Sequence, residues 1–394
     1  MQRSRLLGAL LAGVLASAVP AVVQQPAAAD TSPTTITVFL KAPDPAGLSR
    51  LAAAQGLTHA QRLAELSTLV PSPATRAAVT RDLQARGLRV VDQTAWSVTV
   101  TGATGTAQAL FGTHPSTTTG TSSDRLRAAA SPLPRVPDTL ASVVSAAFPT
   151  DSGPPVFHHH TGALSGGDFR RAYTPATTSA STGSNDSGLT IATMQLANFY
   201  EPDARAGDFG QSTRARDLVS YAHAHRLDNP VGGRYQAIAV NGGPRGQDDM
   251  TGGDIEVALD QESILSTAPT AHQRAYFAPN TTAGYNNVFA RVYHDAIQPG
   301  AHIAAMSVSW GGCEAQTGYP EIHTLEPILQ SLVAAGVTIF AAAGDAGIYD
   351  CGDGRADVDY PASSPSVIGV GGTYLTARSS APNTGRNWTE PGWS

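Results

Sequence analysis

Two carboxylates, Glu256 and Asp260, stand four residues apart in the segment TGGDIEVALDQESIL, residues 251–265. On a helix this spacing makes the two side chains neighbours, and they repel each other by roughly 0.2–0.5 kcal/mol if both are ionised. Charged residues are otherwise few in this chain, since Asp, Glu, Lys and Arg make up 14% of its 394 residues. The pair is either part of a solvated acidic face with Asp254 and Glu262, or a proton-sharing pair that does acid–base chemistry. The spacing alone leaves both alternatives open.

The elements that position this pair are predicted by six apolar stretches separated by helical patterns. Near-continuous apolar strands between helices are typical of a parallel sheet that is covered on both faces. Functional groups of such a sheet gather at the carboxyl ends of its strands, where Asp345 and the dipeptide Trp310-Gly311 stand. No phosphate-binding GxGxxG or GxxxxGK-S/T sequence follows the first stretch, which disfavours a nucleotide enzyme. The six stretches are residues 189–197, 234–240, 273–279, 302–310, 337–344 and 366–372.

A separate α+β unit is predicted for residues 30–149. Residues 34–41 alternate and are β-branched, as in a strand, and residues 88–102 supply two more strands. The helix predicted within residues 72–87 has Ser72 as its N-cap and Gly87 just past its end. A second short helix is predicted in TGTAQALFG. The order β-α-β-β-α-β predicts a ferredoxin-like fold.

The N-terminus predicts export from the cell. Residues 1–29 begin with two arginines, continue with an apolar run and end in Ala27-Ala28-Ala29, as a signal peptide does. Pro20 interrupts the run well short of the ~20 residues that span a membrane, and no later run is long enough to predict a membrane segment. We therefore expect a secreted, extracellular protein without a membrane partner.

Charge and cysteine content narrow the class further. The net charge is −6 and the pI is near 6.0, with no basic run, so a nucleic-acid partner is not expected. Two cysteines in an exported chain predict one disulfide, between Cys313 and Cys351, rather than a metal site. Residues 150–167 are rich in Gly, Pro and His and predict an exposed linker. The three histidines at 158–160 are interpreted as solvated linker residues, with metal binding as the alternative.

Five segments of the chain form a pattern in their order and spacing: EVALD (256–260), YFAPNTTAGY (276–285), SVSWGG (307–312), AAAGDAG (341–347) and DYPASSPSVIGVGGT (359–373). This pattern resembles the sedolisin family of serine-carboxyl peptidases (peptidase family S53), most closely its kumamolisin-like members. The resemblance implies a subtilisin-like catalytic domain, whose N-terminal part is residues 168–394, after a ferredoxin-like activation propeptide at 30–149 and a processing linker at 150–167.

The resemblance assigns chemistry to the carboxylates. It implies that Glu256 is the general base that takes the proton of the nucleophilic serine, while Asp260 holds Glu256 in place. Asp345 matches the aspartate that, when protonated, donates to the oxyanion of the tetrahedral intermediate. This is coherent chemistry, since a nucleophile needs a base within hydrogen-bond reach and a third group that orients the base. The resemblance therefore favours the proton-sharing interpretation over the solvated acidic face.

The resemblance also implies substrate-binding residues. Trp310 and Gly311 match positions that line the cleft and offer backbone hydrogen bonds to an extended peptide, although a core tryptophan is the alternative. Asp359 matches an acidic pocket residue that favours basic side chains, and its alternative role is that of a turn residue before a strand. Gln195 stands where kumamolisin-like enzymes have a glutamate, so that extension of the carboxylate chain is in doubt. The disulfide pairing is also implied by the family.

The nucleophile departs from the family pattern. The family serine lies in a GTSxxxP motif well beyond the aspartate matched by Asp345, and the sequence ends at Ser394 without that motif. The GTS at residues 120–122 lies in the predicted propeptide and has no proline at the required place. The calcium ion of the family is expected for the complete enzyme, but its ligands also follow the serine. We therefore expect a truncated precursor that is inactive as written.

Taken together, the sequence predicts the precursor of an acid-active serine endopeptidase with a Ser-Glu-Asp mechanism. Its expected partners are a protein or peptide substrate and its own propeptide, and a monomer is expected. Two alternatives remain. An ordinary Ser-His-Asp subtilisin relative would use His223 or His225, and a non-catalytic remnant would bind or inhibit a protease.

Overall fold

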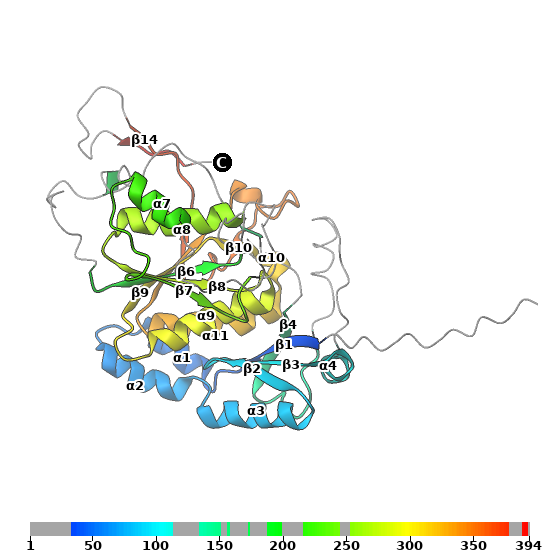
Figure 1. Cartoon of the computed structure of the whole chain (residues 1–394). Coiled ribbons are helices and arrows are strands. Elements are labelled where there is room, and N and C mark those ends of the chain that lie inside the picture. The colour runs from blue at the N-terminus through cyan, green and yellow to red at the C-terminus, as the bar shows by residue number, and fades with distance from the viewer. Residues whose placement is uncertain are drawn as a thin grey trace, which may run out of the picture. The chain divides into compact units, whose positions relative to one another are not determined.

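The computed structural model describes residues 33–112, 134–150, 156–157, 172–173, 187–198, 216–244, 253–377 and 388–392 (Figure 1). All of them lie in the compact unit Thr31–Ser394. The predicted signal peptide, the histidines at 158–160 and the GTS at 120–122 lie outside the described residues. No helix within the described ranges is long and apolar enough to cross a membrane.

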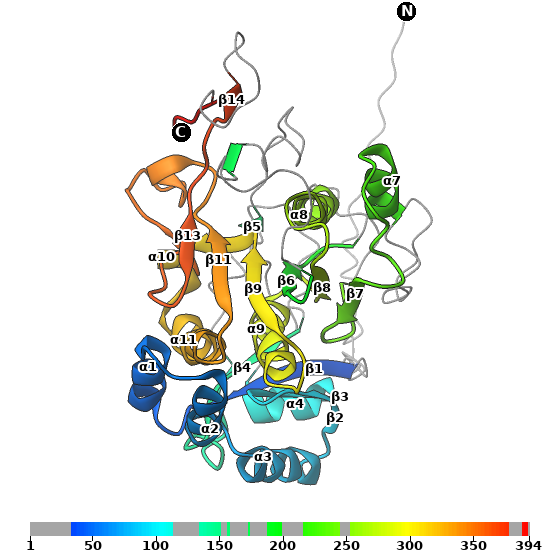
Figure 2. The same cartoon turned by 90° about the vertical axis from the view of Figure 1, so that its left-hand side faces the viewer.

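The six predicted strands form one parallel sheet, which confirms the α/β class of this part of the chain. Figure 2 shows the strands side by side, in the order β13-β11-β9-β6-β8-β7. The neighbouring pairs are all parallel. Their carboxyl ends therefore share one edge of the sheet. The bounds are β6 Thr190–Gln195, β7 Tyr235–Ala239, β8 His272–Phe277, β9 Ile303–Val308, β11 Thr338–Ala342 and β13 Ile368–Val370.

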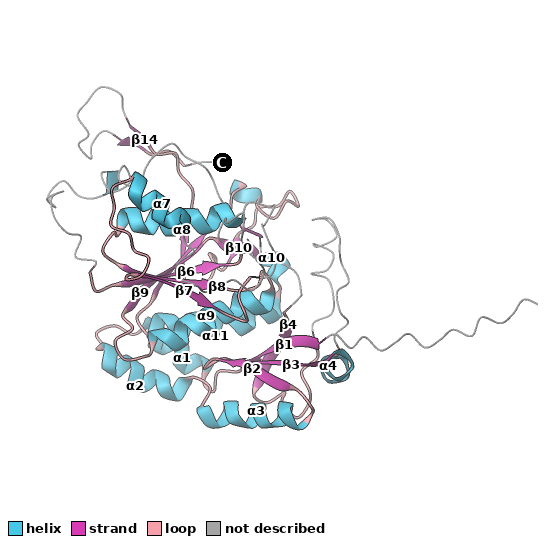
Figure 3. Ribbon diagram, in the orientation of Figure 1, coloured by secondary structure: helices cyan, strands magenta, loops and turns pink. Residues whose placement is uncertain are grey.

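Helices cover both faces of this sheet, as predicted (Figure 3). One face carries α7, Arg216–Ala224, and α8, Gly253–Thr267, and the other carries α9, Thr282–Ala296, and α11, Tyr319–Ala334. Thr281 caps α9, because its side chain accepts a hydrogen bond from the Gly284 amide. The helices bury both faces of the central strands, which explains why those strands are apolar on both sides.

The predicted ferredoxin-like unit is confirmed by a four-stranded antiparallel sheet in the order β2-β3-β1-β4. Ser72 caps α3 as expected, since its side chain accepts a hydrogen bond from the Thr75 amide. Two further helices, α1 and α2, were not predicted, although their caps are readable: Asp44 precedes α1, and Thr58 forms a capping box with Gln61. The bounds are β1 Pro33–Leu40, α1 Pro45–Ala53, α2 His59–Leu69, α3 Pro73–Ala85, β2 Arg89–Gln93, β3 Ser97–Ala103, α4 Thr104–Phe111 and β4 Val144–Pro149.

The two faces of this antiparallel sheet bury different cores. On β1, Ile36 and Val38 point to a core shared with α3 and α4 of the same unit. Phe39 points the other way and joins the core that contains α9 and α11. Because alternate residues of a strand face opposite sides, one short strand serves both cores. Helix α1 lies along α11, which extends the contact between the two parts (Figure 2).

A small antiparallel sheet, β12-β10-β5, lies beyond the carboxyl end of β9, and the sequence did not predict it. The predicted disulfide is confirmed: Cys313 at the end of β10 bonds to Cys351, with 5.1 Å between their Cα atoms. Strand β13 is the outermost strand of the parallel sheet, and the side chains of Ile368 and Val370 on it and of Phe340 on the neighbouring β11 are exposed. The remaining elements are short. Their bounds are β5 Val156–Phe157, β10 Trp310–Cys313, α10 Glu314–Thr317, the 3₁₀ turn Gly347–Tyr349, β12 Asp359–Tyr360, β14 Thr376–Ala377 and β15 Trp388–Thr389.

Candidate active site

The carboxyl edge of the parallel sheet gathers the candidate residues. Gln195 ends β6, Ser309 directly follows β9, and Asp345 follows β11, and these three strands are neighbours in the sheet. Helix α8 begins at the same edge, so that Glu256 lies in its first turn. A helix N-terminus favours negative charge in its first turn. The topology therefore brings carboxylates from distant parts of the sequence to one place.

Asp260 is held by two hydrogen bonds, one to each carboxylate oxygen. The Gln195 Nε2 donates to Oδ2 at 2.9 Å, and the Ser309 Oγ donates to Oδ1 at 2.7 Å. Asp260 is buried, and burial raises its pKa, while the donated hydrogen bonds act in the opposite direction. Asp260 is thus fixed in orientation, and its ionised form is supported by two donors.

Glu256 lies one turn before Asp260 and is only 4% exposed. Burial raises the pKa of Glu256, and repulsion from Asp260 adds to the rise. The Ser309 hydroxyl, which also donates to Asp260, acts in the opposite direction, and repulsion from Asp345 makes a smaller upward contribution. Among the described residues, nothing hydrogen-bonds to its buried Oε2. The solvated acidic face is therefore wrong for Glu256 and Asp260. Two buried, interacting carboxylates of this kind titrate as a pair and can keep a proton between them.

Asp345 lies in an exposed turn after β11. Gly344 precedes it with φ +106°, a conformation that favours glycine. The turn is fixed by Asp350, whose Oδ1 accepts hydrogen bonds from the Asp345 amide at 2.8 Å and the Ala346 amide at 2.6 Å. Asp345 interacts electrostatically with Glu256, so the turn holds the Asp345 carboxyl group within electrostatic range of the buried pair.

Ser309 and Asp350 are the two residues at this site that the sequence analysis missed. The signal for Ser309 was its place after a buried strand, at the edge where functional groups gather. For Asp350, the only signal in the sequence was its position shortly after a glycine that predicts a turn. The geometry also resolves the doubt about Gln195, which contacts Asp260 through an amide instead of a carboxyl group.

Strand β10 forms the backbone platform of the site. The Trp310 side chain is 1% exposed and therefore belongs to the core, while its carbonyl accepts a hydrogen bond from the Tyr285 hydroxyl at 3.1 Å. Gly311 lies so close to β12 that a Cβ atom would come within 2.9 Å of the Tyr360 carbonyl oxygen. The other edge of Trp310 and Gly311 pairs antiparallel with Val156 and Phe157. These two residues belong to the predicted processing linker, which thus takes a place suited to an extended peptide.

Asp359 is a strand residue, not the turn residue of the alternative interpretation. It pairs with Cys313 across β10 and β12 and is 1% exposed. Its charge interacts with the Tyr285 hydroxyl, which in turn donates to the Trp310 carbonyl. Asp359 therefore lies buried beside strand β10, on the neighbouring strand β12 of the same small sheet.

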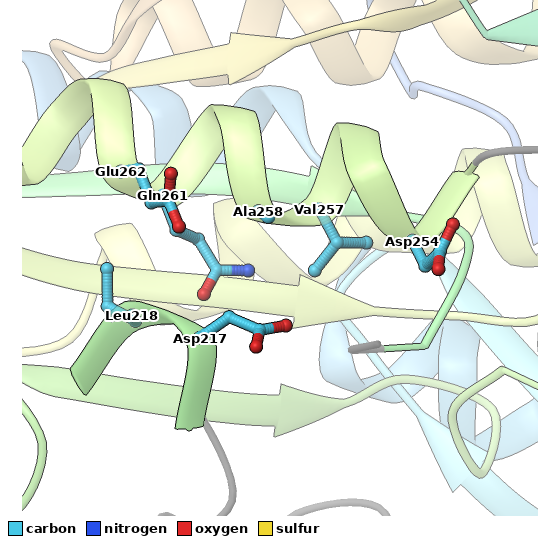
Figure 4. Close-up of a pocket in the computed structure, with 7 residues that line it drawn as sticks. All are labelled: Asp217, Leu218, Asp254, Val257, Ala258, Gln261 and Glu262. Atoms are coloured by element: carbon cyan, nitrogen blue, oxygen red, sulfur yellow. The ribbon is translucent and has the colours of Figure 1, made fainter. Parts of the chain in front are cut away.

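A separate acidic pocket lies between α7 and α8, and Figure 4 shows its lining residues. Glu256, Asp260 and Asp345 are not among them. Asp217 of α7 and Asp254 and Glu262 of α8 bring the carboxylates. Burial, followed by repulsion from Asp217, raises the pKa of Glu262 to about 7. The outer acidic residues of the helix therefore form a second group, separate from the buried pair.

Replacing Glu262 by Gln is expected to stabilise the protein at pH 8 and to change little at pH 4. The folded-state pKa of about 7 exceeds the usual 4.5, so the carboxyl group costs stability as the pH rises from about 4.5 to 7. Allowing for solvent screening, the gain at pH 8 is about 1–2 kcal/mol. Urea unfolding at both pH values measures it, with exposed Glu65→Gln as the control. Equal stabilisation at pH 4 and pH 8 would contradict the charge-based explanation.

Neither histidine of the subtilisin-like alternative lies at the carboxyl edge. His223 is in the last turn of α7, and His225 stacks on Tyr221 with ring centroids 4.1 Å apart. Because α7 runs back from the carboxyl edge, both residues lie toward the opposite edge of the sheet. In the described part of the chain, the one group of three potential metal ligands is Cys313, Cys351 and Asp357, and its two sulfurs form the disulfide.

The architecture and the site together define a class of protein: an α/β domain with a carboxylate cluster at its sheet edge, joined to a ferredoxin-like domain. The comparisons agree with this class. The family model described as "Pro-kumamolisin, activation domain" matches residues 20–153. Kumamolisin of Bacillus sp. (strain MN-32) is 32% identical over 258 residues, which are 62% of this chain and 43% of that protein. Sedolisin of Pseudomonas sp. (strain 101) is 30% identical over 190 residues, 46% and 32% of the two chains.

These matches show that the chain is similar to peptidases of the sedolisin family (S53) and that its N-terminal part is similar to a pro-kumamolisin activation domain. The chain spans less than half the length of these two relatives. Among solved structures, Pseudomonas sedolisin in complex with pseudo-iodotyrostatin matches with 22% identity and a TM-score of 0.45, covering 59% of this chain and 63% of that chain. The epidermin leader peptide processing serine protease of Staphylococcus aureus matches with 11% identity and a TM-score of 0.40, covering 87% and 70%.

Proposed function

We propose that this chain carries the propeptide and the first part of the catalytic domain of a secreted, acid-active serine-carboxyl endopeptidase. The observation that carries the proposal is the buried pair of Glu256 and Asp260, held by Gln195 and Ser309 at the carboxyl edge of the sheet. Burying two like carboxylates together costs stability, and their acid–base chemistry gives a reason for that cost. The nucleophile would be the serine of a GTSxxxP motif, which residues 1–394 do not contain.

In the proposed mechanism, Glu256 is the base. The pair holds one proton, and when the serine attacks the peptide carbonyl, the serine proton passes to Glu256. The pair then gives a proton to the leaving amine, and water completes hydrolysis of the acyl-enzyme by the reverse sequence. Asp260 orients Glu256, as the third member of a triad orients its base. The donors from Gln195 and Ser309 keep Asp260 from rotating.

Asp345 is proposed as the donor to the oxyanion. The tetrahedral intermediate places a negative charge on the former carbonyl oxygen, and a protonated carboxyl group can donate a hydrogen bond to it. An ionised Asp345 would instead repel that charge. The mechanism therefore requires a protonated Asp345, and it is proposed to work at acid pH. The turn that Asp350 fixes gives this donor a defined position.

The proposed substrate is an extended polypeptide that pairs with β10. Val156 and Phe157 of the chain itself already pair with Gly311 and Trp310 in this way, which supports a processing site in residues 150–167. Asp359, buried on the neighbouring strand β12, is proposed to favour a basic side chain of the substrate. Secretion through residues 1–29, a monomeric state and a calcium requirement of the complete enzyme are also proposals, and no described residue is assigned to calcium.

The proposal is tested with the secreted protein in its natural length. Incubation with a denatured protein at pH 3–5 is expected to yield peptides, preceded by loss of the propeptide through cleavage within residues 150–167. Mass spectrometry of the products locates that cleavage. A protein that is processed but cleaves nothing between pH 3 and pH 7 would contradict the proposal and favour the binding or inhibitory alternative.

A further inference from the structure

The contact between the propeptide and the catalytic part contains a buried chain of neutral polar groups. Asn287 lies in the interior of α9, where asparagine is unfavourable, and it is fully buried. Its Oδ1 accepts a hydrogen bond from Ser97 of β3, and its Nδ2 donates to the Oδ1 of Asn241. A helix-interior asparagine with both amide ends engaged indicates a structural role for the amide group itself.

Asn241 continues the chain into the propeptide sheet. It follows β7 with φ 53°, a left-handed conformation that asparagine adopts more readily than most residues. Its Nδ2 donates to Thr37 Oγ1 at 3.0 Å and to Thr99 Oγ1 at 3.1 Å. These threonines are buried, lie opposite each other on β1 and β3, and are joined by a hydrogen bond of 3.0 Å. The two asparagines form what we call the amide socket.

Apolar contacts surround the amide socket. Trp96 packs edge-on against Tyr293 of α9, with ring centroids 6.4 Å apart, and Phe39 joins the same core. A polar group in such surroundings is costly to leave without a partner. Withdrawing the propeptide would remove the Thr37, Thr99 and Ser97 partners of the socket. The socket therefore favours binding of a propeptide that has hydroxyl groups at these three positions.

The charged groups near the socket are few. Strands β1, β3, β4 and β7 contain no Asp, Glu, His, Lys or Arg. On α9, Arg291 and Asp295 pair with each other at 3.1 Å, and half-buried His294 lies in the last turn. The ion pairs between described residues each stay within the propeptide or within the catalytic part.

Two histidines lie near this contact. The His59 ring of α2 lies against Gly336, just past the C-terminal end of α11, and His294 lies in the last turn of α9. A positive charge is favourable at the C-terminal end of a helix.

We propose that the amide socket of Asn241 and Asn287 is the recognition element for the chain's own propeptide, and that this docking contact persists at acid pH. Acid alone then does not release the propeptide, and activation depends on cleavage of the linker and degradation of the docked domain. This inference rests on the proposed role of residues 33–150 as a propeptide, but its test needs no peptidase activity.

The test uses the full chain with one specific protease site placed in residues 161–167 of the linker. After the cut, gel filtration over a dilution series gives the dissociation constant of the propeptide from the rest of the chain. The unsubstituted protein is expected to give the same constant within about threefold at pH 4 and pH 7.5. The readout is binding, so a failure of the proposed catalysis leaves it unaffected.

The variant Asn287→Asp turns the socket into a pH switch. At pH 4 the protonated carboxyl group can still donate to Asn241, but at pH 7.5 the carboxylate cannot. Binding is expected to be at least tenfold weaker at pH 7.5 than at pH 4. Gln330→Glu makes the same amide-to-acid change at the exposed contact with Ser49, and is expected to give constants like those of the unsubstituted protein.

Two results would overturn the inference. Release of the unsubstituted propeptide at pH 4 but not at pH 7.5 would show that acid opens the contact, and loss of that release in His294→Gln would assign the switch to His294. Binding by Asn287→Asp that is like the unsubstituted protein at both pH values would show that the socket does not contribute to recognition. Circular dichroism of each uncut variant checks that it is folded.

Discussion

Replacing Glu256 by Gln is expected to lower kcat/KM of the natural-length protein by about a thousandfold or more. Glutamine has nearly the same shape as glutamate but cannot accept the serine proton, and general-base catalysis contributes up to about 10⁴-fold. The buried position of Glu256 means that no water easily takes its place. The measurement is the rate of cleavage of an internally quenched peptide at pH 4, with folding checked by circular dichroism.

Glu262→Gln is the matched control for this variant. It makes the same chemical change on the same helix, but Glu262 lines the pocket toward α7 and not the buried pair (Figure 4). At pH 4 its kcat/KM is expected to stay within about twofold of the unsubstituted enzyme. If the two variants lost activity equally, the loss would come from damage to α8, and Glu256 would have no special role.

Replacing Asp345 by Ala is expected to reduce kcat by about 10²–10³-fold, the usual effect of losing one oxyanion donor. Asp345→Asn keeps a donor that cannot ionise, so it should retain more activity than Asp345→Ala. Because an amide does not lose its proton, the alkaline limb of the pH profile should also move upward in Asp345→Asn. Steady-state kinetics from pH 3 to pH 8 measures both effects.

The control for Asp345 is Asp353→Ala, an exposed carboxylate in the segment that follows the same turn. It is expected to leave both kcat and the pH profile unchanged. An Asp345→Asn enzyme as impaired as Asp345→Ala, with an unmoved alkaline limb, would show that the aspartate does not act as a proton-bearing donor.

The parallel sheet could be predicted because its strands are continuous apolar runs such as residues 302–310, which burial on both faces requires. The caps of α3 were equally readable, since Ser72 acts through local hydrogen bonds. Strand β5 could not be predicted, because two residues carry no periodicity and exist as a strand only through pairing with β10. The same holds for the contact of Ser309 with Asp260, since it depends on the distance between two elements far apart in the sequence.

The spacing of the carboxylates alone did not separate the roles of Glu256 and Glu262, because both stand on one helix with other acidic residues, and only the family resemblance distinguished them. In the structure, the packing of α8 separates them, because one side of the helix lies against strands β6 and β8 and another side lies against α7. The amide socket was likewise invisible in the sequence, where Asn241 and Asn287 are single polar residues beside apolar runs. Long-range packing supplies the information in each case.

The pH dependence of kcat/KM for the natural-length enzyme tests the central claim most directly, which is that buried carboxylates take the place of a histidine base. The profile is predicted to have its maximum below pH 6 and to fall toward neutrality as the carboxylate pair loses its proton. The activity at that maximum should disappear in Glu256→Gln. A maximum at neutral or alkaline pH that persists in Glu256→Gln would contradict the claim.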